Sequence, residues 1–151
     1  ADTDPSYARD TLDVNFLSPA TLCLHLALQF ERQRSGCLAV IGSVAGDRIR
    51  LSNYIYGTAK GALALFLDGL RMRLQPFGVC VIAVKPGFVD TPMTADVRKG
   101  PLFASAEAVG AGIHRAMKRS RGGTIYLPGF WRAVMTGIRL TPGPIFRRLP
   151  I

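Results

Sequence analysis

Tyr56 and Lys60 are the two side chains whose types and spacing most directly suggest chemistry in this sequence. Residues four apart on a helix share one face and lie about 6 Å apart along its axis. A tyrosine hydroxyl has an ordinary pKa of about 10, and a neighbouring ammonium favours the phenolate and lowers that pKa. We therefore expect Lys60 to tune the Tyr56 hydroxyl for proton transfer at neutral pH.

The elements that must position this pair follow from the apolar pattern. Helical spacing and end signals predict three helices, over residues 6–34, 53–75 (capped by Ser52 or Asn53) and 105–119 (capped by Ser105). Short apolar runs predict three buried strands, over residues 37–41, 79–84 and 124–127. Helices that alternate with strands covered on both faces imply a parallel sheet with right-handed crossovers. The expected fold class is α/β, with a doubly wound parallel sheet.

Length and composition limit what else the chain can be. With 151 residues, it suits one domain, residues 1–151. Three cysteines, an odd number spread through apolar runs, suggest buried reduced thiols rather than disulfides or a metal site. No apolar run approaches the roughly 18 residues of a membrane span, and the polar N-terminus is unlike a signal peptide. We expect a cytoplasmic protein with no metal ligands.

The basic charge is concentrated at the C-terminal end. Residues 1–107 hold 11 Lys/Arg and 10 Asp/Glu, whereas residues 108–151 hold 8 Lys/Arg and no acid. Such a block attracts phosphate, anionic lipid or nucleic acid, or it is simply a solvated face. No nucleic-acid-binding motif accompanies it, so nucleic acid is not an expected partner.

The tail over residues 128–151 is amphipathic as well as basic. It could lie on an anionic membrane surface with four apolar side chains inserted, those of Phe130, Trp131, Met135 and Ile138. A packed dimer helix explains the same pattern almost equally well. The sequence leaves both interpretations open, the first placing the protein at the inner face of the membrane.

Further residues place Tyr56 and Lys60 in a wider pattern. Ser43 stands 13 residues before Tyr56, at the end of a predicted strand, and Asn15 follows a valine in the first helix. Together with the Tyr-Gly-Thr-Ala-Lys run of residues 56–60, and with Pro86-Gly87 followed by a threonine, these residues resemble the short-chain dehydrogenase/reductase family. The resemblance covers nearly the whole chain, as the C-terminal part of that family's single domain, and implies a Rossmann-like doubly wound parallel sheet.

The resemblance implies roles for four catalytic residues. Tyr56 would donate a proton in reduction and accept one in oxidation, and Lys60 would lower its pKa and hold the nicotinamide ribose. Ser43 would hydrogen-bond the substrate oxygen. Asn15 would hold a water molecule that links Lys60 to solvent. The expected activity is NAD(P)-dependent interconversion of a ketone and a secondary alcohol.

The same resemblance implies the cofactor-binding residues. NAD(P) would be contacted by Tyr56, Lys60, Pro86, Gly87, Val89 and Thr91, with the carboxamide bonded by the Val89 backbone and the Thr91 hydroxyl. The family's Gly-x-x-x-Gly-x-Gly turn occurs nowhere in this chain. We therefore expect that the N-terminal cofactor-binding half is missing here, that this chain alone is inactive, and that its first helix and strand are partly uncovered.

Substrate and partners are the least determined features. In the family, the segments matching residues 92–105 and 128–151 set the substrate. Residue patterns across the chain are similar to those of the family branch that includes the decaprenylphosphoryl-2-keto-ribose reductases. This similarity would imply a substrate with a keto sugar on a polyprenyl phosphate. A homo-oligomer through the long helices is expected by the same resemblance. The alternative is a non-catalytic relative that serves as a dimerising or membrane-docking module.

Overall fold

Three parallel strands form the central sheet of the computed structural model, which describes residues 4–148. They are hydrogen-bonded in the order β1-β2-β5, with the bounds β1 Cys37–Ile41, β2 Cys80–Pro86 and β5 Gly123–Leu127. In the register of the sheet, Cys37 of β1 lies opposite Cys80 of β2, and Ile82 of β2 lies opposite Gly123 of β5. The structure confirms all three predicted strands and their parallel direction. It adds a separate parallel pair, β3 Phe88–Asp90 and β4 Phe103–Ser105.

The three predicted helices are also present. The first is divided into α1 Pro5–Leu12, a π-helical turn Asp13–Leu17 and α2 Ser18–Gln33. The others are α3 Tyr54–Leu74 and α4 Ala106–Arg119, and two short helices follow β5, α5 Trp131–Leu140 and α6 Gly143–Phe146. Ser105 caps α4 as predicted, its Oγ accepting from Ala108 N at 3.2 Å. Asn53 occupies the N-cap of α3, but its side chain makes no capping bond.

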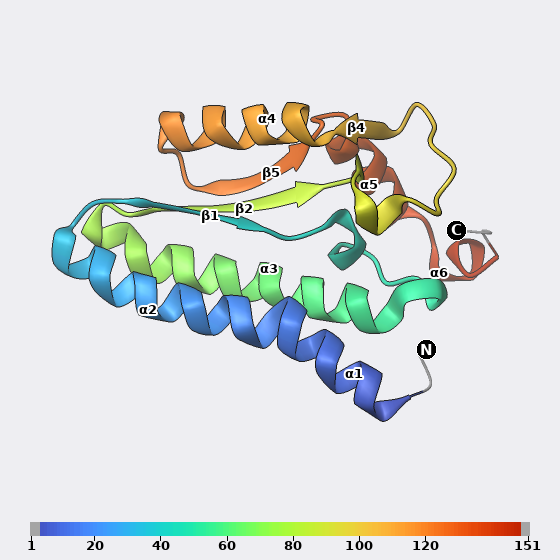
Figure 1. Ribbon diagram of the computed structural model, residues 1–151, viewed down its shortest axis with the longest axis horizontal. Coiled ribbons are helices and arrows are strands. Elements are labelled where there is room, and N and C mark those ends of the chain that lie inside the picture. The colour runs from blue at the N-terminus through green and yellow to red at the C-terminus, as the bar shows by residue number, and fades with distance from the viewer. Residues whose placement is uncertain (1–3, 149–151) are drawn as a thin grey trace.

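The helices cover both faces of the sheet. In Figure 1, α2 and α3 lie along one face and α4 along the other, while α5 and α6 gather near the end at which the strands terminate. This arrangement confirms the doubly wound α/β class. Ligands in such sheets bind beyond the carboxyl ends of the strands, so α5 and α6 lie at the functional end.

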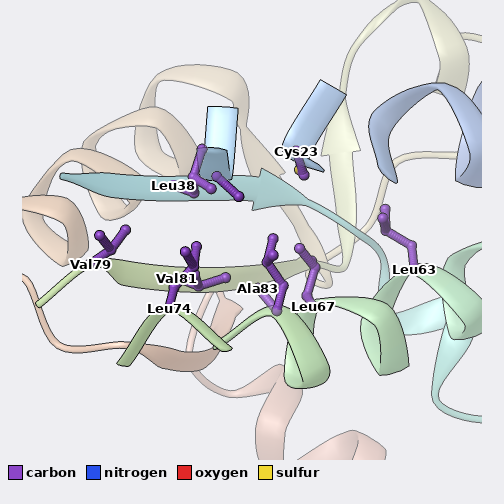
Figure 2. Packing of buried hydrophobic residues seen from close by; sticks show 10 residues of the cluster. Cys23, Leu38, Leu63, Leu67, Leu74, Val79, Val81 and Ala83 are labelled. Atoms are coloured by element: carbon purple, nitrogen blue, oxygen red, sulfur yellow. The ribbon is translucent and has the colours of Figure 1, made fainter. Parts of the chain in front are cut away.

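The sequence of strand β2 is an unbroken apolar run because both faces of the strand are covered. Val81 and Ala83 belong to the core cluster between β2 and α3, shown in Figure 2. Ile82 and Val84 point the other way, into a cluster that includes Ile113 of α4. Because both faces of a central parallel strand are covered, both sets of alternating side chains must be apolar.

The buried face of α3 differs slightly from the predicted stripe. Leu63, Leu70 and Leu74 are buried as expected, but Leu67 is also buried while Phe66 is only partly so. Small rotations of this kind are set by the partner surface rather than by the helix itself, because the sheet and α2 together define the groove that α3 fills.

Apolar surface remains on the N-terminal side of the fold. Ile41, on the strand β1 that forms one edge of the sheet, is 58% exposed, and α2 presents Leu22, Leu24 and Leu28 to solvent. By length and composition alone, the continuous helix Pro5–Gln33 could cross a membrane, which the sequence analysis did not expect. The core helix of a soluble protein meets the same criterion, and this one contributes Cys23 and Ala27 to the core.

The structure buries part of the tail's apolar face, which was expected to be free to enter a membrane. Trp131 and Met135 are only 5% and 4% exposed, and Ile138 packs against the same cluster. Phe130 alone of the four proposed membrane-inserting side chains is exposed. The apolar face of α5 is directed into the protein because it covers the ends of the strands. Residues 149–151 of the proposed tail lie outside the described residues.

A buried polar cluster ties the loop after β1 to the other strands. Asp47 forms an ion pair with Lys85 of β2, and the two side chains are 2% and 13% exposed. The Tyr126 hydroxyl of β5 donates to the second Asp47 oxygen at 2.7 Å. Burial and the bond to Asp47 raise the pKa of Tyr126 to about 12, which keeps that hydroxyl a donor. The cluster fixes the loop over the sheet.

Replacing Asp47 should therefore destabilise the fold strongly. Asp47→Asn leaves the Lys85 ammonium buried without its counter-charge, a change that costs about 3 to 5 kcal/mol in comparable pairs. The matched control is Asp68→Asn, which removes an exposed pair with Arg71 and should cost less than about 1 kcal/mol. Urea unfolding measures both. Equal losses would show that the Asp47–Lys85 pair contributes no more than a surface pair.

Candidate active site

The site is built on a close approach between the loop after β1 and helix α3. The turn Val44–Gly46 packs on the first turns of α3, backbone against backbone. A Cβ on Gly46 would lie 2.6 Å from Gly61 N, and one on Gly57 would lie 3.0 Å from Ala45 O. No larger side chain fits at Gly46 without displacing the helix, so the sequence Val-Ala-Gly opposite Gly57 and Gly61 permits this contact.

That contact brings Ser43 to Tyr56. Ser43 has an extended backbone and its Oγ accepts from Ala45 N at 3.1 Å, which fixes the hydroxyl at the start of the turn. Tyr56 lies in the first turn of α3, and its hydroxyl interacts with the Ser43 side chain. Two residues that the sequence predicted to act together are therefore in contact.

The electrostatics of Tyr56 differ from the sequence prediction. Burial raises the pKa of Tyr56 above its ordinary value, and the hydrogen bond with Ser43 only partly opposes that rise. Lys60 Nζ lies 5.6 Å from the Tyr56 ring centroid, as the spacing predicted. Burial has the opposite effect on Lys60: it lowers the pKa, because desolvation disfavours the charged form of a lysine. Desolvation is thus the main influence on the pKa of Tyr56 in this structure, and the role expected of Lys60 stays a prediction.

Asn15 lies in the π-helical turn between α1 and α2. Its Nδ2 donates to Thr11 O at 3.1 Å, and the turn packs beside α3. The extra residue in a π-turn shifts the backbone hydrogen bonds of a helix, and such turns occur frequently at functional sites. The sequence predicted the helix and the residue but carried no signal for the turn.

The segment after β2 forms the opposite side of the site. The Gly87 amide donates to Leu127 O at 3.1 Å, so the chain is held to the end of β5 just after Pro86. The Thr91 hydroxyl donates to Val89 O at 3.4 Å, and Thr94 donates to the same oxygen at 2.6 Å. These bonds give the Val89–Thr91 segment a defined shape next to the cavity.

A cavity of about 300 Å³ lies between these segments. Of the sequence-predicted residues, Ser43, Tyr56 and Gly87 line it, whereas Asn15, Lys60, Pro86, Val89 and Thr91 do not. Most of its other walls come from the two segments expected to contact substrate, together with Phe88 of β3. These walls are mostly apolar, formed by Phe88, Met93, Leu102, Val134, Met135 and Ile138. The cavity can therefore hold an apolar group with one polar end at Ser43 and Tyr56.

Sequence reasoning missed several polar groups of this cavity. Arg48, Arg50, Asn53 and Trp131 line it. Asn53 Oδ1 and Trp131 Nε1 are buried without a hydrogen-bond partner in the described part of the chain. Arg48 and Arg50 follow Ser43 closely in the sequence, and their position just after a strand end was the signal that could have identified them.

The residues present fit a nicotinamide cofactor in one respect. Lys60 is a partly buried cation with no carboxylate partner among residues 4–148, so its ammonium remains available to donate hydrogen bonds to hydroxyl oxygens. At Gly87 the indole of Trp131 stands so close that an added Cβ would lie 1.9 Å from Nε1. Gly87 is thus a position where only a bare backbone fits.

Comparison with known proteins identifies the family. The short chain dehydrogenase model matches residues 1–102. An uncharacterized oxidoreductase of Mycobacterium tuberculosis is 34% identical over 150 residues, covering 99% of this chain and 60% of the relative. Cyclohexanol dehydrogenase of Rhodococcus is 36% identical over 95 residues, covering 59% of this chain and 35% of the relative.

Solved structures agree on the fold. A short chain dehydrogenase of Burkholderia cenocepacia in complex with NADP has a TM-score of 0.82 at 22% identity, covering 98% of this chain and 63% of that one. A 4-hydroxyisoleucine dehydrogenase complexed with NADH and succinate has a TM-score of 0.73 at 18% identity, covering 86% and 60%. The chain thus spans about 60% of the length of the first relative. It belongs to the short-chain dehydrogenase family.

Proposed function

We propose that the protein is an NAD(P)-dependent oxidoreductase that interconverts a ketone and a secondary alcohol. The observation that carries this proposal is the contact of the Ser43 and Tyr56 side chains at a largely apolar cavity, with Lys60 beside the Tyr56 ring. A hydroxyl pair at the polar end of an apolar cavity is suited to bind a carbonyl oxygen and to protonate it.

Each residue has a defined task in this proposal. A bound nicotinamide supplies or accepts the hydride, and similar structures carry NADP or NADH. Ser43 donates to the substrate oxygen, and Tyr56 gives its proton to the alkoxide that develops there. Lys60 holds the ribose and Asn15 the proton-relay water. The Pro86–Thr91 segment would contact the nicotinamide when it is bound.

The cavity also favours a class of substrate. Its apolar walls suit a hydrocarbon group, and Arg50 is a partly buried cation at the wall with no anionic partner in the described residues. A keto sugar attached to a polyprenyl phosphate offers both features. The volume of about 300 Å³ is at the lower end for small-molecule sites, so the cavity would hold the reacting end of such a molecule.

Tyr56→Phe should abolish turnover. Removing the hydroxyl deletes the proton donor, an effect worth about a hundredfold or more in rate. The assay follows nicotinamide absorbance with a panel of ketones, in the protein encoded by the complete reading frame. Tyr54→Phe is the matched control and should retain activity, because residue 58 is threonine rather than lysine.

Two outcomes of that assay would contradict the proposal. Full activity in Tyr56→Phe would remove Tyr56 from the chemistry. No turnover and no cofactor binding by the unaltered protein would favour a non-catalytic dimerising or membrane-docking module. The 151-residue chain assayed alone should be inactive, and robust turnover by it would contradict the expectation that a cofactor-binding half is needed.

In the absence of cofactor, Tyr56 should ionise above the ordinary tyrosine value of 10.0. A raised pKa means that the hydroxyl keeps its proton throughout the neutral range, as ketone reduction requires, and loses it only in alkali. Ultraviolet difference titration of the unaltered protein against Tyr56→Phe measures this ionisation. Ionisation near pH 7 would instead show that Lys60 outweighs burial.

Arg50→Gln should weaken binding of anionic substrates selectively. Loss of the cation removes a charge-assisted contact, so KM for a ketone bearing a phosphate should rise about tenfold or more. KM for an uncharged ketone of similar size should change little, and that substrate is the control. Equal changes for both would indicate that Arg50 does not face the anionic group.

A further inference from the structure

Arg48 holds the C-terminal end of helix α5. Its Nη1 lies 2.7 Å from Ile138 O, 3.0 Å from Arg139 O and 2.6 Å from Thr141 O. The last carbonyls of a helix lack partners within it and carry partial negative charge, so a guanidinium is well matched to them. Arg48 also lies 4.0 Å from the ring centroid of Phe146, which brings α6 into the same contact.

Arg48 is itself held in place from the opposite side. Its neighbour Asp47 is fixed by the buried ion pair with Lys85 and by the Tyr126 hydroxyl. The same loop begins at Ser43, whose hydroxyl contacts Tyr56. Arg48 therefore joins a rigid loop that carries a catalytic side chain to a helix more than 80 residues later, with a separation of 90 residues to Ile138.

Helix α5 forms one wall of the cavity. Trp131, Met135 and Ile138 line it, and Ile138 is also one of the residues whose carbonyl Arg48 binds. The N-terminal end of α5 is anchored separately, because the Trp131 ring packs 5.7 Å from that of Phe88. Arg48 supplies the anchor at the other end, so the distance from this wall to Ser43 and Tyr56 depends on it.

We propose that Arg48 is a positioning residue for substrate: by binding the carbonyls at the end of α5, it sets the apolar wall against which a hydrocarbon-bearing ketone binds. Arg48 does not take part in proton transfer. The predicted effect of Arg48 on substrate binding rests on the proposed function, whereas its predicted effect on helix α5 does not. The expected signature is weaker binding of long substrates with the chemical step largely preserved.

Steady-state kinetics of Arg48→Met test the first part, in the protein encoded by the complete reading frame. For a long-chain methyl ketone, KM should rise about tenfold with kcat within about threefold. For acetone, which has no hydrocarbon chain to pack against α5, and for the nicotinamide cofactor, KM should be unchanged. Arg48→Lys retains a cationic donor and should recover most of the loss. A fall in kcat with unchanged KM would overturn the proposal.

Hydrogen exchange measured by mass spectrometry tests the second part without any turnover. Amides of α5 and α6 should exchange about tenfold faster in Arg48→Met, while those of α3 remain protected and show that the fold is intact. Arg132→Gln is the matched control, because Arg132 is an exposed arginine on α5 itself. Unchanged exchange in α5 would overturn the proposal. Absence of turnover in the unaltered protein would refute the proposed function and leave this measurement decisive for Arg48.

Discussion

The backbone contact between the turn Val44–Gly46 and helix α3 is the constraint on which the rest of the site depends. It is possible because Gly46 faces Gly61, where a methyl group would clash, and Gly57 faces Ala45, where a methyl group would be crowded. Side chains elsewhere can adjust by changing rotamer, but two backbones at contact distance cannot. This contact brings Ser43 and Tyr56 close enough for their side chains to interact.

The loop that makes this contact interacts with three parts of the structure: helix α3, the sheet and the tail. Toward α3 it presents Gly46, toward the sheet it presents Asp47 for Lys85 and Tyr126, and toward the tail it presents Arg48. Successive residues point in different directions, so one short segment can join elements that are distant in sequence. A rigid loop of this kind can hold Ser43 and Arg48 in fixed positions at a largely apolar cavity.

The sequence predicted the parts of the molecule that depend on local pattern. The apolar run of β2 identified a strand buried on both faces, and the interval from Ser43 to Tyr56 identified the site, because both are read along the chain. The rise that burial causes in the pKa of Tyr56 was not predicted, since burial is a property of the fold. Asp47 and Arg48 were missed because their partners lie 38 to 93 residues away.

The basic tail shows why an amphipathic pattern alone does not identify its partner. The pattern correctly indicated that one face of α5 is buried, but it could not say whether lipid, a second subunit or the protein itself covers that face. In the structure the apolar side chains Trp131 and Met135 cover the cavity, whereas Arg132 and Arg139 remain exposed. The apolar face cannot serve both the cavity and a membrane. An attraction to an anionic surface through the outward arginines would leave the cavity wall intact.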